Sequence, residues 1–298
     1  MIKAKRLGHA TFETPDLDKQ IDYYCNVVGL AVVSREPNKA YLATNTGQLT
    51  VVLEKGTQQT CTRLAFEVSP DMSTADMAKA LSTHGIKSEA RSDALPGVTT
   101  SLTFTDSKDT TIDLFSQWSF IPNNGPVTTG AVPNKLGHLA WVCNDPKAIA
   151  DFYVQVLGFR VSDWIGDYFG FLRCGVDHHT VNFIRGPQER MHHFAFELRD
   201  PVHLHNACDL LGRNKIEIVW GPVRHGPGHN VATYHRNPDD QMVEFFIELD
   251  RMYDEELGYF DPRPWHRDRP QKPKVWDQNQ PRDVWGLPPG PNWVRQNK

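Results

Sequence analysis

An internal repeat constrains the fold of this 298-residue chain more than any other feature. Residues 7–12 (LGHATF) resemble residues 136–141 (LGHLAW), and both copies stay in step afterwards. In each copy an Asp precedes a Gly by 13 residues, and the apolar residues between them follow the 3.6-residue spacing of an amphipathic helix. These pairs are Asp16 with Gly29 and Asp145 with Gly158. Each copy therefore predicts a helix that lies between strands.

The correspondence continues beyond these helices. Residues 66–68 match residues 196–198, and residues 112–115 match residues 243–246, at offsets of 130 and 131 against 129 at the start. One domain has therefore been duplicated. The repeat and its Pro-, Gly- and Asn-rich junction predict four parts of the chain: an N-terminal domain at 1–120, a linker at 121–134, a C-terminal domain at 135–250 and an extended tail at 251–298.

Each copy also divides into two similar modules. Strand-like starts at His9 and Arg63 lie 54 residues apart, and those at His138 and His193 lie 55 residues apart. Within a module the order is a strand, a helix and three short strands. In the third module the short strands are expected at 160–164, 168–173 and 180–185. The fold class is α+β, with four βαβββ modules paired into two tandem domains whose sheets curve around a concave face.

Composition limits the partners of the chain. Its 32 basic and 36 acidic residues give a net charge of -4, so no overall positive field attracts a phosphate backbone, and we expect no nucleic-acid partner. No window reaches ~18 uninterrupted apolar residues, and the start lacks the apolar stretch of a secretory signal. We therefore expect no membrane partner and a cytoplasmic protein. The five cysteines form no CxxC pair, so we expect them to be reduced.

The segment from Met252 onward has no periodicity. It holds eight of the 21 prolines and four of the eight tryptophans, which are Trp265, Trp276, Trp285 and Trp293. A solvated tail would contain few tryptophans, so we expect an extended segment that packs on the second domain or on a neighbouring subunit. The alternative is disorder. Together with the apolar composition, the tail favours a homo-oligomer.

Histidines gather in the second copy, where nine of the 13 lie between His178 and His235. His138 and His193 occupy equivalent positions near the starts of the third and fourth modules. Glu244 lies in an apolar strand, where an unpaired carboxylate would be costly to bury. Two neutral imidazoles and one carboxylate from three strands form a facial triad suited to non-haem Fe(II). A lone strand histidine is more often structural, but the recurrence at duplicate-related positions favours metal binding.

The first copy provides an internal comparison. Its equivalents of the three triad residues are His9, Arg63 and Asp113. Arginine stays protonated in proteins and cannot ligate a metal ion. We therefore expect the first domain to hold no metal and to serve as a scaffold.

A motif near the end of the second copy is more specific. His225 precedes Tyr234 by nine residues, and Tyr234 precedes Glu244 by ten, within HGPGHNVATYHRNPDDQMVE. Both intervals resemble the signature of type I extradiol ring-cleavage dioxygenases (catechol 2,3-dioxygenase-like) of the vicinal oxygen chelate superfamily. The resemblance covers the whole repeat and implies two tandem glyoxalase-like domains. It departs at Thr233, where an apolar residue is usual, and at Asp240, where Gly or Pro is usual and the local turn is affected.

The resemblance implies roles for six residues. His138, His193 and Glu244 match the iron ligands, His179 matches the acid/base histidine, and His225 and Tyr234 match residues that hydrogen-bond the substrate oxygens. His178 and His192 are direct neighbours of two of these histidines, so a register error of one residue is open. Because strand side chains alternate, each neighbour is expected on the opposite face. The match of Gly137-His138 to His192-His193 favours His193, and His179 is preferred over His178.

The resemblance also implies an Fe(II)-dependent enzyme, with Mn(II) as the alternative ion, that inserts both atoms of O2 into a catechol and cleaves its ring next to the paired hydroxyls (meta cleavage). Fe(II) is a Lewis acid, and beside a base such as Tyr234 or His225 it favours loss of a catechol proton. His179 suits proton transfer near neutral pH. Two alternatives stay open, namely a glyoxalase-like lyase or isomerase of the same superfamily and a metal-free protein that binds small aromatics. Alkyl-, chloro- and carboxycatechols and biaryl diols all remain candidate substrates.

Overall fold

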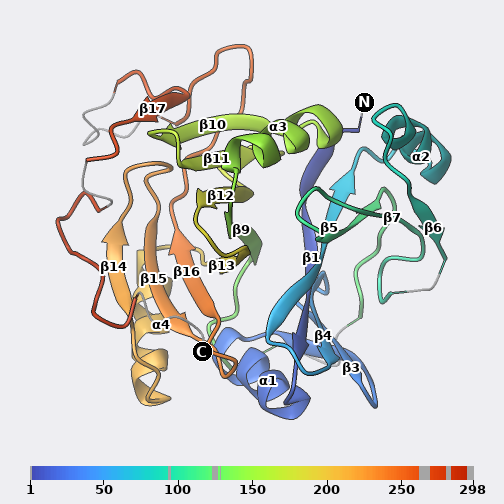
Figure 1. Cartoon of the computed structure of the whole chain (residues 1–298). Helices are drawn as coiled ribbons and strands as arrows, with labels where there is room; N and C mark the ends of the chain where they lie inside the picture. Colours follow the sequence, from blue (N-terminus) through green and yellow to red (C-terminus); the bar gives the residue numbers. More distant parts are fainter. Residues whose placement is uncertain are drawn as a thin grey trace.

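Two mixed sheets with few helices make up the computed structural model, which describes residues 2–92, 95–122, 127, 129–261, 269–279 and 283–293 (Figure 1). The first sheet has eight strands in the order β2-β3-β4-β1-β5-β8-β7-β6. The second has nine strands in the order β14-β15-β16-β13-β9-β12-β11-β10-β17. Read in reverse and without β17, the second order repeats the first strand for strand.

Two modules build the first sheet. The first contains β1 (Ala4–Thr14), α1 (Leu17–Tyr23), the π-helical turn η1 (Tyr24–Val28), β2 (Ala31–Glu36), β3 (Lys39–Ala43) and β4 (Leu49–Lys55). The second contains β5 (Thr60–Val68), α2 (Thr74–Ser82), β6 (Glu89–Arg91), β7 (Ser101–Thr105) and β8 (Thr111–Phe115). In each module the first strand pairs in parallel with the last, and antiparallel pairing of β1 with β5 joins the modules.

The second sheet repeats this construction. Its first module contains β9 (Lys135–Cys143), α3 (Pro146–Leu157), β10 (Arg160–Ile165), β11 (Phe169–Arg173) and β12 (Val181–Arg185). Its second module contains β13 (Arg190–Glu197), α4 (Pro201–Arg213), β14 (Trp220–Arg224), β15 (Val231–Arg236) and β16 (Met242–Ile247). The predicted α+β fold of four βαβββ modules is confirmed. The domain limits given for 1–120, 121–134, 135–250 and 251–298 stay predictions.

The helix ends follow from the Asp and Gly pairs of the repeat. Asp145 accepts hydrogen bonds from the backbone N–H groups of Lys147 and Ala148 at 3.1 and 3.0 Å, and α3 ends at Gly158, whose φ is 72°. A glycine at this left-handed position is the usual end of a helix. In the first copy Gly29 ends η1 with a φ of 88°. Among the described residues, no helix is both long and apolar enough to span a membrane.

A core shared by the two sheets fixes them against each other. Side chains alternate along each strand, so one face of each sheet is apolar, and the apolar faces contribute to one buried cluster. The ring centroids of Phe12 and Phe194 lie 4.6 Å apart, and those of Phe66 and Phe159 lie 5.4 Å apart. In Figure 1, β1 and β9 lie side by side at the centre of the molecule. The opposite face of the second sheet lies outside this shared core and is available for a site.

A buried hydrogen bond also joins the two repeats. The Tyr23 hydroxyl lies 2.6 Å from Nε2 of His235, and both residues are buried. Burial lowers the pKa of His235 to about 3, so the imidazole is neutral in the folded protein. Because a buried polar atom without a partner is costly, this pair favours one arrangement of the two domains.

The turn before β16 tolerates the departure at Asp240. This residue has a φ of 60°, a conformation that glycine adopts most easily and that Asp and Asn accept more readily than other side chains. The side-chain oxygen of Asn237 accepts hydrogen bonds from the N–H groups of Asp239 and Gln241 at 3.0 and 2.9 Å. The local turn therefore forms without the usual Gly or Pro.

The described part of the tail packs on the second sheet. Strand β17 (Lys274–Trp276) pairs in parallel with β10 at the edge of that sheet (Figure 1). Trp293 packs against Trp220, with ring centroids 4.8 Å apart. The predicted packing of the tail on the second domain is confirmed for these residues, whereas Trp265 lies outside the described residues.

Substitution of Gly158 tests the left-handed backbone conformation at the end of α3. Replacing Gly158 by Ala should lower the free energy of unfolding by about 2 kcal/mol, because the positive φ is unfavourable for alanine. A Cβ there would also lie 2.5 Å from the carbonyl oxygen of Ile2. Gly212→Ala is the control, since a Cβ at this α4 position meets nothing within 4 Å and helix propensity favours alanine by about 1 kcal/mol. Urea unfolding measures both variants, and equal effects would contradict this account.

The neutral state of His235 predicts a pH-dependent stability. Its folded pKa of about 3 lies below the ordinary value of 6.5, so its contribution is present above pH 6.5 and is lost as the pH falls toward 3. In His235→Phe, the loss of unfolding free energy between pH 7 and pH 5 should shrink by about 2 kcal/mol relative to the wild type. Urea titrations at the two pH values test this, and parallel pH profiles would refute it.

Candidate metal centre

Three adjacent strands bring His138, His193 and Glu244 together. Ala195 of β13 pairs with His138 of β9 on one side and with Glu244 of β16 on the other. His193 lies two residues before Ala195 on the same strand, so its side chain projects from the same face. The register of the sheet therefore places all three side chains on the concave face.

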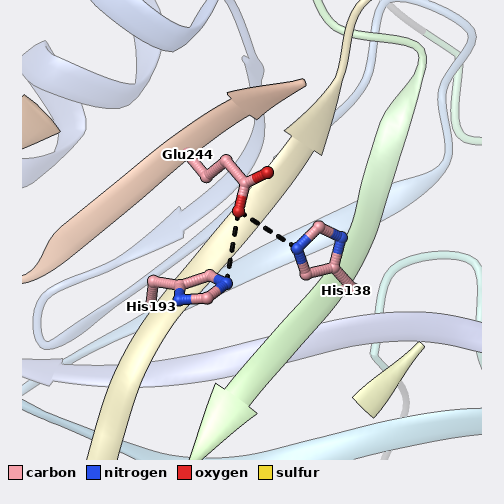
Figure 2. Close-up of side chains that lie close together, drawn as sticks. All are labelled: His138, His193 and Glu244. Carbon is pink, nitrogen blue, oxygen red and sulfur yellow. Dashed lines mark hydrogen bonds and ion pairs between the residues drawn. The ribbon is translucent and has the colours of Figure 1, made fainter. Parts of the chain in front are cut away.

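The metal-binding atoms of these side chains converge on a small volume. Nε2 of His138 and Nε2 of His193 lie 3.1 and 3.2 Å from the same carboxylate oxygen of Glu244 (Figure 2). One ligand atom from each residue can be chosen so that all lie within 4.8 Å of one another. All three residues are buried. The sequence predicted this constellation, and the roles of its members as ligands stay predictions.

Electrostatics around Glu244 favour a cation. Burial alone would raise the pKa of this carboxyl, but the imidazoles of His138 and His193 hold it well below its ordinary value. Burial lowers the pKa of His193, although Glu244 opposes the effect. Asn230 donates a hydrogen bond to the second carboxylate oxygen at 3.0 Å, and no Lys or Arg is among the described residues bonded to Glu244. A buried anion without a Lys or Arg partner among the described residues suits a divalent ion.

In the first sheet, an arginine balances the charge of the corresponding carboxylate. Ala65 pairs with His9 on one side and Asp113 on the other, which repeats the register of the second sheet. Here Arg63 donates to both carboxylate oxygens of Asp113, at 2.7 and 2.9 Å. Burial lowers the pKa of His9 to about 4. The guanidinium thus balances the charge of this carboxylate, and a metal-free first domain stays a prediction.

The expectation for His192 is wrong. Strand alternation would place it on the face opposite His193, yet both line the same cavity. A register shift in β13 between Met191 and His193 interrupts the alternation at this point. Nδ1 of His192 lies 2.7 Å from Nδ1 of His193, so it can accept a hydrogen bond from Nδ1–H of His193 and leave Nε2 of His193 free for a metal ion. The imidazoles of His138 and His193 and the carboxylate of Glu244 together fit a divalent ion.

An apolar cavity opens beside the three ligand candidates. Its walls are largely aromatic or aliphatic and include Ile165, Phe169, Phe171, Ile184, Trp220 and Trp293. Sequence analysis assigned neither Asn230 nor Trp293 to the site, because only the folded chain brings the tail and the loop between β14 and β15 (residues 225–230, the signature loop) to it.

His225 and Tyr234 face this cavity as a hydrogen-bonded pair. Nε2 of His225 lies 2.7 Å from the Tyr234 hydroxyl, and the Tyr234 ring stacks on Trp220 with centroids 5.4 Å apart. Burial, reinforced by Glu244, raises the pKa of Tyr234 well above its ordinary value, so the phenol is neutral. The nine-residue interval therefore places two polar groups at one wall, as the motif predicted.

The cavity also distinguishes His179 from His178. The ring of His179 lines the cavity and lies 4.3 Å from that of His138, measured between centroids, whereas His178 is not among the lining residues. Burial lowers the pKa of His179 well below its ordinary value, and His138 adds to this effect. Both histidines lie in the loop between β11 and β12, so strand alternation does not apply to them. The geometry favours His179 as the acid/base candidate.

Comparison with known proteins agrees with this site. Residues 135–245 match the family model of the Glyoxalase/Bleomycin resistance protein/Dioxygenase superfamily. The biphenyl-2,3-diol 1,2-dioxygenase of Paraburkholderia xenovorans (strain LB400) is 24% identical over 305 residues, which cover 95% of this chain and 97% of that protein. These residues of the second sheet are therefore similar to this superfamily. The resemblance to extradiol dioxygenases of the vicinal oxygen chelate superfamily that the motif indicated is confirmed.

Solved structures share the fold. The Mn(II)-bound glyoxalase from Novosphingobium aromaticivorans superposes with a TM-score of 0.84 at 23% identity, over 99% of this chain and 95% of that one. The homoprotocatechuate 2,3-dioxygenase from Brevibacterium fuscum, in complex with 3,4-dihydroxyphenylacetate, gives a TM-score of 0.79 at 24% identity, over 99% and 93%. At these identities the likeness establishes the fold.

Metal binding should depend on Glu244. In Glu244→Gln the neutral amide no longer balances a divalent ion, so affinity for Fe(II) or Mn(II) should fall by at least about 100-fold. Glu248→Gln, four residues further on and outside the triad, should leave the affinity unchanged. Metal content after dialysis and calorimetric titration measure both variants, and equal retention of metal would contradict the assignment.

Proposed function

We propose that this protein is an extradiol dioxygenase that uses O2 to cleave a catechol next to its paired hydroxyls. One observation carries the proposal: two imidazoles and one carboxylate from three strands lie at the floor of an apolar cavity. Three protein donors are fewer than a divalent transition metal requires, so positions remain for substrate and oxygen. The full-length similarity to a biphenyl-2,3-diol 1,2-dioxygenase supports the same conclusion.

We propose Fe(II) as the physiological ion, held by His138, His193 and Glu244. Nitrogen and carboxylate oxygen donors suit Fe(II), and Mn(II) accepts the same set. When bound, the ion supplies Lewis acidity toward a substrate hydroxyl and the electron transfer that reaction with O2 requires. The bonds of His192 to His193 and of Asn230 to Glu244 would orient two of the donors.

The chain's own residues handle the ring and the protons. The aromatic and aliphatic walls bind the ring of the substrate and exclude water. His225 and Tyr234 present a polar pair at one wall, where they can hydrogen-bond the substrate oxygens. His179 is a neutral imidazole beside the ligand candidates, so one of its ring nitrogens can accept a proton from the substrate and later return it.

We also propose that the protein acts in the cytoplasm as a homo-oligomer. The segment that follows the second sheet carries large apolar side chains in solvent, namely Tyr253, Leu257, Tyr259, Val284, Trp285 and Leu287. Exposed apolar side chains of this size are typical of protein–protein contacts. Sedimentation velocity tests the assembly, and a monomer at all protein concentrations would refute it.

Two other functions remain in competition. A glyoxalase-like lyase or isomerase is supported by the fold shared with the Mn(II)-bound glyoxalase. A metal-free aromatic-binding protein is supported by the apolar cavity alone. The spacing of His225, Tyr234 and Glu244 and the position of His179 favour the dioxygenase.

Turnover of catechols separates these functions. After anaerobic reconstitution with Fe(II), a panel of alkylated, carboxylated and biaryl catechols should give O2 uptake and a yellow product with at least one member. Glu244→Ala should abolish uptake under the dioxygenase hypothesis and leave ligand affinity nearly intact if the protein only binds aromatics. Conversion of a glutathione hemithioacetal without any O2 uptake on catechols would support the lyase or isomerase and refute the dioxygenase.

A further inference from the structure

A chain of hydrogen bonds extends from the cavity into the protein behind His179. Nδ1 of His179 lies 3.0 Å from Nδ1 of His178, and Nε2 of His178 lies 3.0 Å from a carboxylate oxygen of Asp163 on β10. All three residues are buried. Neither His178 nor Asp163 lines the cavity, and the motif assigned neither of them a role.

The carboxylate determines where the protons lie along this chain. An ionised carboxylate only accepts, so Nε2 of His178 carries the proton that is donated to Asp163. A neutral His178 then has a bare Nδ1, which can only accept. Nδ1 of His179 must therefore carry a proton and donate it to His178. The remaining nitrogen of His179, Nε2, is left without a proton and is the one free to accept from a substrate.

The C-terminal segment holds Asp163 in its role as an acceptor. Nε1–H of Trp276 donates to the same carboxylate oxygen as His178, at 2.7 Å, and the N–H of Lys274 donates to the other oxygen at 3.0 Å. In both contacts the carboxylate of Asp163 is the acceptor. Both tail residues belong to β17, whose pairing with β10 places them beside Asp163.

Packing fixes the two imidazoles in place. The ring of Phe260 lies 4.8 Å from that of His178, and the ring of Phe171 lies 5.4 Å from that of His179, measured between centroids. Gly228 of the signature loop approaches so closely that a Cβ there would lie 3.1 Å from Nδ1 of His178 and 3.3 Å from Cε1 of His179. Rotation of either ring would therefore require the loop to move.

We propose that Asp163 and His178 are positioning residues that hold His179 in the tautomer with a bare Nε2 facing the cavity, and that β17 of the tail completes this arrangement through Trp276. The part of this inference in which His179 accepts a substrate proton rests on the proposed function. A proton then passes from a substrate hydroxyl to Nε2 of His179, and the negative charge of Asp163 stabilises the imidazolium that results. The tail thereby contributes a hydrogen bond, from Trp276 to Asp163, to the arrangement of the candidate site.

The tautomers can be read directly from the wild-type protein. In metal-free protein with 15N-labelled histidine, ring 15N spectra at pH 8 should show His179 protonated at Nδ1 and His178 protonated at Nε2. His178→Gln and His179→Gln assign the signals. A proton on Nε2 of His179 would overturn the proposal, whatever reaction the protein catalyses.

Asp163→Asn tests the same arrangement through kinetics. An amide can donate to Nε2 of His178, which reverses both tautomers and leaves His179 with a protonated Nε2 toward the cavity. With the metal-reconstituted enzyme we expect kcat to fall by about 100-fold or more, with KM for the catechol and metal content unchanged. Trp276→Phe removes one donor and keeps the carboxylate, so kcat should fall measurably but by less than about 10-fold.

The outcomes separate the two claims. Two results with an active wild type would overturn the positioning role alone. In the first, Asp163→Asn keeps its kcat. In the second, Asp163→Asn loses metal and folding together with kcat, and Trp276→Phe has no effect. Absence of O2-dependent turnover in the wild type would overturn the proposed function, and the 15N spectra would still decide the tautomers. Asp163→Glu should recover part of the activity, because it restores an acceptor-only group.

Discussion

A carboxylate enclosed by protein must be balanced by charge, and the structure is organised around that requirement at Glu244. The residue is fully buried and is bonded by two imidazoles and one amide, none of which carries a permanent positive charge. A cation nearby would balance this buried negative charge, which is otherwise costly to keep away from water. A divalent ion would supply the balancing charge. It would lie where the register of three strands brings the ligand candidates together, beside the apolar cavity and the polar pair at its wall.

The duplicated sheets give two solutions to the same problem. In both, an alanine on the central strand separates a histidine from a carboxylate in the same register. The first sheet balances Asp113 internally with Arg63, which makes a complete ion pair. The second sheet has His193 at the corresponding position, so no arginine balances its carboxylate, which suits the proposed divalent ion. Two changes of residue type, Arg63 to His193 and Asp113 to Glu244, therefore separate a closed structural pair from a candidate metal centre.

Much of this could be predicted from the sequence, and the reasons for the remainder are physical. The repeat predicted four modules because helix and strand periodicities depend on local residue order, and the nine- and ten-residue intervals located His225, Tyr234 and Glu244. The side of the sheet on which His192 lies could not be predicted, since a bulge in β13 breaks the alternation. Nor could the contact of Trp276 with Asp163, because the path of an aperiodic tail depends on tertiary packing.

The central claim is that His138, His193 and Glu244 bind one divalent ion. An anaerobic crystal structure of the Fe(II)-loaded protein, with diffraction data collected at the iron absorption edge, tests it most directly. The account predicts one strong anomalous peak, roughly 2 Å from Nε2 of both histidines and from a Glu244 carboxylate oxygen. An iron peak bound to other side chains, or none at these three in fully loaded protein, would contradict it.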